Sequence, residues 1–180
     1  MKIGTVDVTW TIKPGRNFMA GNNIDPWSVS SVITERNTAK HSAFTNFAST
    51  VLSCRQSTPH YDEGWKGQFF LGIMLAGMSE LGDSEHIKKR DSILIQPGDV
   101  YVIDPMVAHW AIYPNWIRSK KKKGYLGITF DISKKKLWEV KEIVNGMTGF
   151  RLSEERLVRG SMAEKVYKYL ERCGFKKHLE

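Results

Sequence analysis

Histidine and aspartate stand two residues apart in the segment His60-Tyr61-Asp62, and their spacing suits metal binding. In a β-strand, residues i and i+2 point to the same side, so an imidazole and a carboxylate placed in this way can hold one ion. The spacing alone has a simpler explanation: a turn histidine and an aspartate that accepts hydrogen bonds from turn amides give the same pattern. A third donor from another segment would favour the metal.

His109 is the candidate for that third donor. It follows an apolar strand-like segment, Val100 to Ile103, and a turn at Asp104-Pro105, so it begins a separate strand. A histidine flanked by Ala108 and Trp110 is also an ordinary core residue. Taken together, the three residues predict a metal site, and no catalytic residue beyond the ligands is predicted. Two histidines and one carboxylate leave coordination positions open, which suits iron(II) that must also bind a co-substrate and oxygen.

Short strands are the elements expected to position these residues. Apolar alternation and apolar runs, bounded by Gly and Pro, predict them at Thr5 to Ile12, Trp27 to Glu35, Phe69 to Leu75, Ser92 to Ile95, Val100 to Ile103, His109 to Tyr113 and Tyr125 to Ile132. Residues 17–27 are rich in Gly, Asn and Pro and indicate a loop, and residues 58–65 indicate a turn or a strand end. Strands at this spacing favour a sandwich or barrel over a parallel α/β sheet.

Helices are expected at three places. Apolar residues on one face of Ser42 to Leu52 are compatible with a short helix. Ser133 can cap a helix that carries Leu137, and Ser153-Glu154-Glu155 opens another that ends near Gly174. We therefore expect a single domain over 1–180, with a barrel core at about 54–131 and C-terminal helices within 133–178.

Length and composition indicate a folded chain without a membrane segment. The 180 residues are 41% hydrophobic, enough for a core of their own. No apolar run approaches the roughly 20 residues of a membrane helix, and no signal peptide is expected. Cys54 and Cys173 lie far apart outside any Cys/His cluster, so we expect free thiols in a reducing compartment, the cytoplasm.

Positive charge is concentrated in runs. The net charge is +8, with clusters at 88–90, 120–123, 134–136 and 176–177. Such runs can neutralise phosphates and attract a polyanion, so nucleic acid is one class of partner to consider. A solvated surface that keeps the protein soluble explains the same charges. No motif specifies a substrate or an oligomeric state.

The pattern His60-x-Asp62 followed by a distal His109 resembles that of the iron(II)- and 2-oxoglutarate-dependent dioxygenases. The turn Pro97-Gly98-Asp99 and the apolar strand after it also resemble the segment before the distal histidine of that family. The resemblance covers roughly Cys54 to Asp131. It implies a double-stranded β-helix (jelly-roll) barrel, with iron(II), 2-oxoglutarate and oxygen used to oxidise an unactivated C–H bond.

The same resemblance implies a basic residue that pairs with the far carboxylate of 2-oxoglutarate. Arg118 is the first candidate, because the planar guanidinium binds a carboxylate with two hydrogen bonds. Lys123 is the second, with Thr129 as its hydroxyl partner. In this family a Ser or Thr often follows the basic residue by two positions, whereas Lys120 stands there after Arg118.

Two alternatives stay open. Gly98 through Pro105 and His109 to Asn115 resemble the second motif of the cupins, which share the barrel and often the metal, although the spacing departs from theirs. Their first motif usually has His-x-His and a later Glu, whereas this chain has His-x-Asp with Gln68 downstream. A cupin isomerase, a dioxygenase without 2-oxoglutarate or a binding module fits this reading. The other alternative is a metal-free jelly-roll interaction protein.

Overall fold

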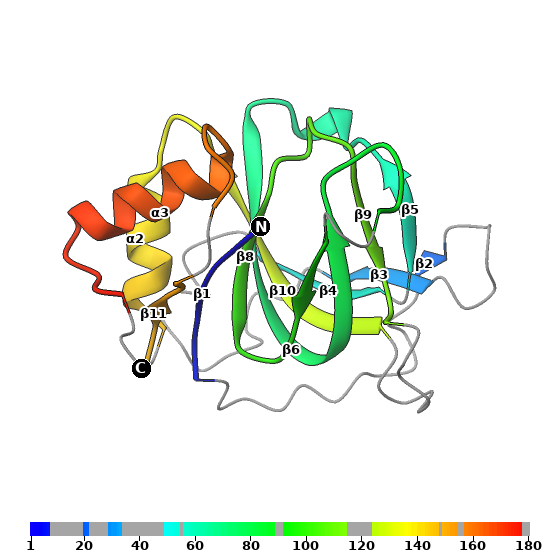
Figure 1. Ribbon diagram of the computed structural model, residues 1–180, viewed down its shortest axis with the longest axis horizontal. Coiled ribbons are helices and arrows are strands. Elements are labelled where there is room, and N and C mark those ends of the chain that lie inside the picture. Colours follow the sequence, from blue (N-terminus) through cyan, green and yellow to red (C-terminus); the bar gives the residue numbers. More distant parts are fainter. Residues whose placement is uncertain are drawn as a thin grey trace.

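The structure is a computed structural model that describes residues 1–7, 20–21, 29–33, 49–54, 56–88, 92–114, 124–147, 149–154 and 157–177. Antiparallel strands form two sheets, and helices cover one side of the larger sheet (Figure 1). The architecture is mainly β and of the double-stranded β-helix type, as the sequence predicted. Within the described residues, no helix is long and apolar enough to cross a membrane.

The strands are short except for two. Their bounds are β1 Lys2–Thr5, β2 Ala20–Gly21, β3 Val29–Ile33, β4 Ser49–Cys54, β5 Ser57–His60, β6 Gln68–Gly82, β7 Ser92–Ile95, β8 Asp99–Ile103, β9 His109–Ile112, β10 Gly124–Ser133 and β11 Arg151–Leu152. The helices are the 3-10 turn η1 Glu63–Trp65, then α2 Trp138–Asn145 and α3 Met162–Arg172.

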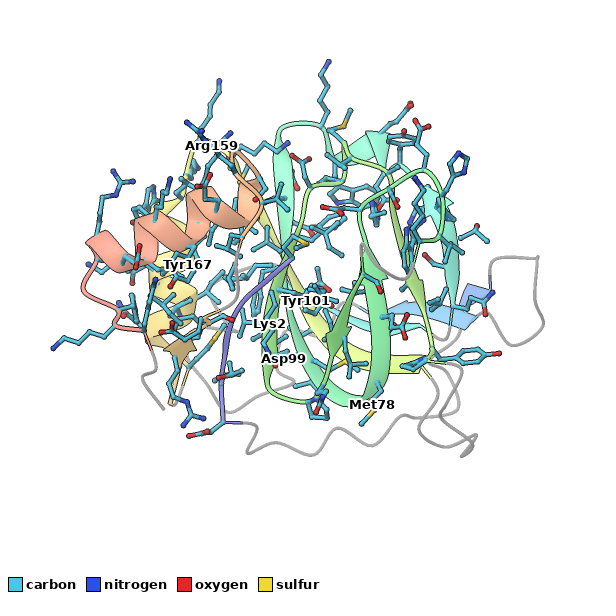
Figure 2. All side chains as sticks on the ribbon, in the orientation of Figure 1. Lys2, Met78, Asp99, Tyr101, Arg159 and Tyr167 are labelled. Atoms are coloured by element: carbon cyan, nitrogen blue, oxygen red, sulfur yellow. The ribbon has the colours of Figure 1, made fainter. Side chains whose placement is uncertain are left out.

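Strand β6 belongs to both sheets. Residues 68–78 of β6 pair with β10, and residues 70–73 also pair with β8, in the main sheet, whose order is β11-β1-β8-β6-β10-β4-β3-β2. The last four residues, 79–82, pair with β7 and β9 in the second sheet, where β9 also pairs with β5. On the other side of β8, an ion pair of 3.2 Å between Lys2 and Asp99 joins β1 to β8 (Figure 2).

Alternate residues of the central strands face two different environments. Leu71, Val102 and Phe130 belong to the core that the main sheet forms with the helices. The intervening positions Gly72 and Tyr101 lie on the opposite face, because successive side chains of a strand alternate. Tyr101 is 2% exposed and packs with a smaller apolar cluster drawn from both sheets. The main core therefore lies outside the barrel, beneath the helices.

The helices pack their apolar faces on the sheet. In α3, Ser161 is the N-cap and its side chain accepts a hydrogen bond from the backbone of Glu164, while Val166 and Leu170 are fully buried. The helix ends at Arg172, and Gly174 follows with a φ of +91°, a left-handed conformation that favours glycine after a helix. The predicted stop near Gly174 is confirmed.

Several predicted elements are wrong in type or extent. Residues 49–52 of the expected helix Ser42 to Leu52 belong to strand β4, which pairs with β3 and β10, and the remainder lies outside the described residues. The β-branched Thr50 and Val51 suit a strand, and pairing on both sides outweighs the helical periodicity. The first strand is Lys2–Thr5, so Thr5 is its last residue; of the strand expected at Thr5 to Ile12, residues 6 and 7 are outside any strand and residues 8–12 lie outside the described residues. The expected loop at 17–27 contains β2.

The C-terminal helices begin later than predicted. Ser133 ends β10, and α2 is instead preceded by Leu137, which provides no side-chain cap. Ser153 and Glu154 do not open a helix, because α3 starts only after Ser161. Of the two helices, only α3 has a serine at its N-cap, and this is Ser161 rather than the predicted Ser153.

Candidate metal centre

The backbone brings the three predicted ligands together at one end of the second sheet. His60 is the last residue of β5 and His109 the first of β9, and the two are direct partners in the antiparallel register. Asp62 lies just beyond β5, at the position that precedes η1. The prediction placed both His60 and Asp62 on one strand. In the structure only His60 belongs to the strand, and Asp62 lies in the turn that follows it.

Donor atoms of His60, Asp62 and His109 all lie within 4.8 Å of one another. His109 Nε2 is 3.3 Å from Asp62 Oδ2, and His60 Nε2 is 3.8 Å from Asp62 Oδ1. The imidazole centroids are 4.3 Å apart. Imidazole and carboxylate ligands lie about 2.0–2.2 Å from a transition metal, so neighbouring donors stand about 3–3.5 Å apart. The observed separations match a single ion with a small movement of His60.

Both histidines have their ring orientation fixed in the same way. His60 Nδ1 lies 2.7 Å from the carbonyl oxygen of Thr58, and His109 Nδ1 lies 2.9 Å from that of Val107. A carbonyl oxygen only accepts, so each Nδ1 must carry the proton and donate it. In the neutral rings Nε2 then has a free lone pair, and both lone pairs face Asp62. A backbone carbonyl that fixes the tautomer is the usual support of a metal-bound histidine.

The carboxylate between the rings is held in its charged form. A hydrogen bond with His109 and the charges of both histidines lower the pKa of Asp62, although partial burial acts in the opposite direction. Neutral rings with bare Nε2 atoms would place three acceptors against one another. A cation relieves that arrangement, either as a proton on an imidazole or as a metal ion shared by all three groups.

The turn of residues 104–107 forms hydrogen bonds with Asp62 and with His109. Asp104-Pro105 opens a β-turn in which Val107 N donates to Asp104 O, with a distance of 3.0 Å, and Met106 N donates to the Asp104 carboxylate. Asp and Pro are favoured at these turn positions. The Pro105 carbonyl accepts from Asp62 N at 3.0 Å. The turn predicted at Asp104-Pro105 is confirmed, and it forms hydrogen bonds with two of the three predicted ligands, Asp62 and His109.

Large apolar side chains on the same segments are left in solvent. Tyr61, Trp65, Met106 and Val107 are between 38% and 48% exposed. Tyr61 lies between two of the predicted ligands in the sequence, and Met106 and Val107 precede the third, His109. Trp65 follows Asp62 by three residues, and its backbone N–H donates to the carbonyl of Asp62. Exposed apolar residues gathered in this way mark surfaces that bind a partner or ligand. We call these four residues the apolar rim.

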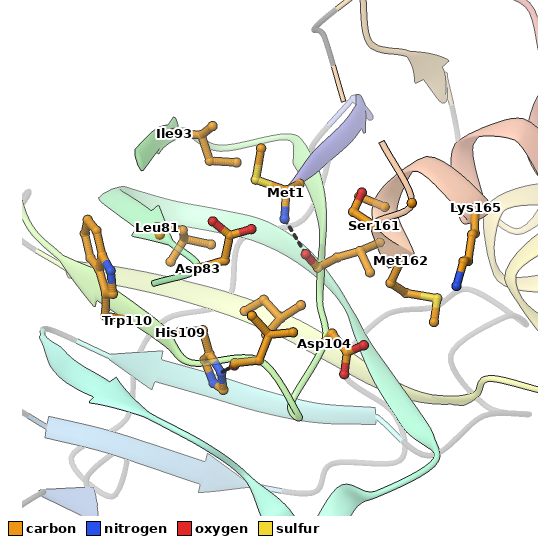
Figure 3. A pocket seen from close by; sticks show the side chains of 16 residues that line it. Met1, Leu81, Asp83, Ile93, Asp104, His109, Trp110, Ser161, Met162 and Lys165 are labelled. Carbon is orange, nitrogen blue, oxygen red and sulfur yellow. Dashed lines mark hydrogen bonds between the residues drawn. The ribbon is translucent and has the colours of Figure 1, made fainter. Parts of the chain in front are cut away.

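A cavity of about 180 Å³ lies beside one of the ligands (Figure 3). His109 lines it, together with apolar residues of the barrel such as Leu81 and Ile103, while His60 and Asp62 do not. Met162 and Lys165 of α3 form the other wall. The cavity is thus mostly apolar and reaches the candidate centre from the side of His109.

Of the three residues predicted to bind 2-oxoglutarate, the structure describes only Thr129. Arg118 and Lys123 lie outside the described residues. Thr129 is on β10, is 9% exposed, and its hydroxyl has no hydrogen-bond partner. Among the tryptophans considered as pocket residues, Trp110 lines the cavity, Trp65 is exposed, and Trp116 lies outside the described residues.

Two polar groups near the centre were not found by sequence reasoning. Asp131 accepts a hydrogen bond of 3.3 Å from the indole of Trp65, and burial raises the pKa of its carboxyl group. Lys134 forms an ion pair with Asp104. Asp131 has no distinguishing sequence pattern, and Lys134 is hidden in a run of three lysines. By contrast, His86 is exposed as expected.

Comparisons with known proteins show similarity of fold. No protein-family model matches the chain, and no curated protein matches its sequence. Among solved structures, a Cupin 2 conserved barrel domain protein from Salinispora arenicola is 13% identical, with a TM-score of 0.41, over 76% of this chain and 98% of that one.

A conserved protein with a double-stranded beta-helix domain from Klebsiella pneumoniae is 13% identical, with a TM-score of 0.39, over 77% of this chain and 87% of that one. Ectoine synthase from P. lautus is 12% identical, with a TM-score of 0.37, over 77% of this chain and 85% of that one. At these values the similarities assign no activity to the chain, so the function must be argued from the site.

Proposed function

We propose that this protein is a metal-dependent enzyme of the cupin type, which binds one divalent transition-metal ion through His60 Nε2, Asp62 and His109 Nε2. The observation that carries the proposal is the pair of imidazoles, each with Nδ1 bound to a backbone carbonyl and Nε2 facing the same carboxylate. Histidines that lie on the surface without a shared function are not expected to have the same ring orientation and to face the same carboxylate.

Iron(II) is the metal that this donor set favours. Two histidines and one carboxylate leave open positions, which is typical of non-haem iron oxygenases. When bound, such an ion supplies activation of oxygen or polarisation of a substrate oxygen. The chain's own part is to supply the Asp62 carboxylate and to direct both Nε2 atoms toward it, with the rings oriented through Thr58 and Val107.

The surroundings of the site favour a substrate with an apolar portion. The apolar rim borders the ligands, and the cavity beside His109 is lined largely by aliphatic side chains. The charged residues that line the cavity, apart from His109, are Asp83, Asp104 and Lys165, and Asp131 lies on β10, so carboxylates outnumber lysines here. A polyanion, which the basic runs suggested, would meet apolar surface and negative charge here, so we propose a small uncharged or cationic substrate.

Dependence on 2-oxoglutarate is a separate proposal that the described residues support less well. Its expected basic partners, Arg118 and Lys123, lie outside them. The unpartnered hydroxyl of Thr129 is the one feature that favours it, because a buried hydroxyl without a partner costs free energy until something bonds to it.

Anaerobic calorimetric titration of iron(II) into the protein tests the metal site. We expect saturable binding of one ion, which His60→Ala and His109→Ala both abolish. His86→Ala is the matched control, since His86 is an exposed histidine that is not a member of the cluster, and it should bind as the wild type does. Equal binding by all three variants would contradict the proposal.

The same loaded protein distinguishes the two co-substrate hypotheses. If 2-oxoglutarate binds only in the presence of iron, the oxygenase reading with that co-substrate is correct. If iron binds and 2-oxoglutarate does not, the cupin reading without it stands. If the folded wild-type protein binds no iron, the remaining hypothesis is a metal-free barrel protein.

A further inference from the structure

Lys134 differs from the other members of its basic run in being partly buried and paired at short range with a carboxylate that is remote in the sequence. Its ammonium group donates to both carboxylate oxygens of Asp104, each at 2.8 Å. The side chains are only 27% and 23% exposed, whereas Lys135 and Lys136 are exposed. A paired and partly buried lysine is less accessible to a polyanion than its exposed neighbours, so its presence at this position needs another reason.

The backbone of Lys134 contacts the segment that carries Asp62. Its N–H donates to the carbonyl of Gly67 at a distance of 3.0 Å. Gly67 has a φ of +86°, a left-handed conformation in which glycine is favoured, and it closes the turn that runs from Asp62 through η1 into β6. Lys134 therefore fixes the far end of this ligand segment to the end of β10.

The side chain of Lys134 contacts the segment that carries His109. Its partner Asp104 begins the turn at 104–107, and the carbonyl of Val107 in that turn accepts from the imidazole of His109. Pro105 in the same turn accepts from the backbone of Asp62. Through Asp104, the lysine thus holds the turn on which two ligands depend.

We propose that Lys134 is a positioning residue for the metal centre: it joins the two ligand segments at the end of β10 and fixes the directions of Asp62 and His109. It does not touch the metal. A charge-assisted bond to both oxygens of Asp104 sets the carboxylate's orientation, because the lysine donates two hydrogen bonds from one point. The effect on metal binding rests on the proposed function, but the ordering of the two segments does not.

The test compares Lys134→Met with Lys135→Met. The two substitutions remove the same charge and keep a similar side-chain length in adjacent positions, but only the first breaks the ion pair. Since an unpaired Asp104 in a partly buried position destabilises the fold, the pair is also removed together as Lys134→Met with Asp104→Asn. Lys134→Arg, which retains charge and hydrogen bonding, serves as the rescue variant.

Two readouts are followed. Without metal, hydrogen exchange at the amides of Asp62 and Val107 reports the order of the two segments, with the amide of Ile128 in the β10 ladder as an internal reference. With cobalt(II) chloride as the probe, the visible spectrum and its titration report the ligand geometry and affinity.

For Lys134→Met and for the double variant, we expect exchange at Asp62 and Val107 to be about tenfold faster with Ile128 unchanged. We also expect cobalt affinity to fall about 10–100-fold with an altered spectrum, as when an outer-shell partner of a metal ligand is lost. Lys135→Met should match the wild type, and Lys134→Arg should recover most of the affinity.

The outcomes separate this inference from the proposed function. If the wild type binds no cobalt but the amides of Asp62 and Val107 exchange faster in Lys134→Met, the positioning role stands and the proposed function fails. If the wild type binds cobalt and Lys134→Met matches it in both readouts, the positioning role is wrong and the metal site stands. Equal effects in Lys134→Met and Lys135→Met would also overturn it.

Discussion

Two regions of the barrel, the end with the predicted metal ligands and the side covered by the helices, differ in whether apolar or ionisable side chains are buried. Beneath the helices, apolar residues of the sheet and of α3 are almost completely buried, and charged residues such as Lys168 and Arg172 remain in solvent. At the ligand end, the apolar rim is exposed, while the ionisable groups of Asp62 and His109 are partly or largely buried and paired.

Under the proposed function, this difference separates residues that stabilise the fold from residues that bind metal and substrate. Burial of apolar area is the main contribution to the free energy of unfolding. Apolar side chains that stay exposed, next to polar groups that are buried, therefore leave the fold less stable than it could be. The helix side is where stability should be most sensitive to substitution, and the ligand end is where metal binding should be most sensitive. Four substitutions test the comparison, in order of decreasing effect.

Leu170→Ala should produce the largest loss of stability. Leu170 is fully buried between α3 and the main sheet, and removal of such a side chain costs about 2–5 kcal/mol of unfolding free energy. Chemical denaturation checks this, and iron affinity should not change. Val158→Ala, at an exposed position, is the control and should be close to neutral. A Leu170→Ala variant with normal stability and weakened metal binding would reverse the comparison.

Asp62→Asn should have the converse effect. The substitution keeps the size of the side chain but removes the negative charge between two imidazoles, so we expect iron affinity to fall by more than about 100-fold, beyond the loss seen for outer-shell partners. The melting temperature of the metal-free protein should change little. Glu63→Gln removes the neighbouring exposed carboxylate and should leave affinity intact; equal losses in both variants would argue for general electrostatics instead of ligation.

Gly72→Ala examines the barrel interior, which lies between the two regions. A Cβ atom at Gly72 would lie 2.2 Å from the ring of Tyr101, so the ring must move, at a cost of about 1–3 kcal/mol. Thermal denaturation is the measurement. At Gly64 an added Cβ meets nothing within 4 Å, so Gly64→Ala should be nearly neutral. If Gly72→Ala is also neutral, Tyr101 does not fill the barrel as described.

Asp131→Asn should have the smallest effect, and one that depends on pH. Burial raises the pKa of Asp131 in the folded protein, although its bond with Trp65 opposes this. The native state then binds the proton more tightly than the unfolded chain, so stability falls as the pH rises from the ordinary value of 3.8 through the folded pKa. In denaturation curves across this window, the asparagine variant should lack that decline; a parallel decline in both proteins would exclude Asp131 as its source.

Much of the barrel could be predicted from the sequence where local signals and pairing agree. The bounds of β7 at Ser92–Ile95 were predicted as observed, because an apolar run there is followed by Pro97-Gly98. In contrast, β4 was mistaken for a helix, since its apolar residues also fit a helical face and its pairing partners β3 and β10 are remote in sequence.

The clustering of His60, Asp62 and His109 could be predicted from the sequence, whereas their role as metal ligands stays a prediction. His60 and Asp62 are close in sequence, and the turn before His109 has a clear Asp-Pro signal. What the sequence does not contain is the set of contacts that orient these residues: the carbonyls of Thr58 and Val107 become partners only once the strands pair. The role of Lys134 was likewise hidden, because a run of lysines looks the same whether one of them is buried or not.

The central claim is that one metal ion binds between His60, Asp62 and His109, and a crystal structure of the protein soaked in cobalt(II) tests it most directly. The account predicts one anomalous difference peak about 2.0–2.2 Å from both Nε2 atoms and from a carboxylate oxygen of Asp62. Absence of a peak there, or cobalt bound only elsewhere or through Nδ1, would contradict it.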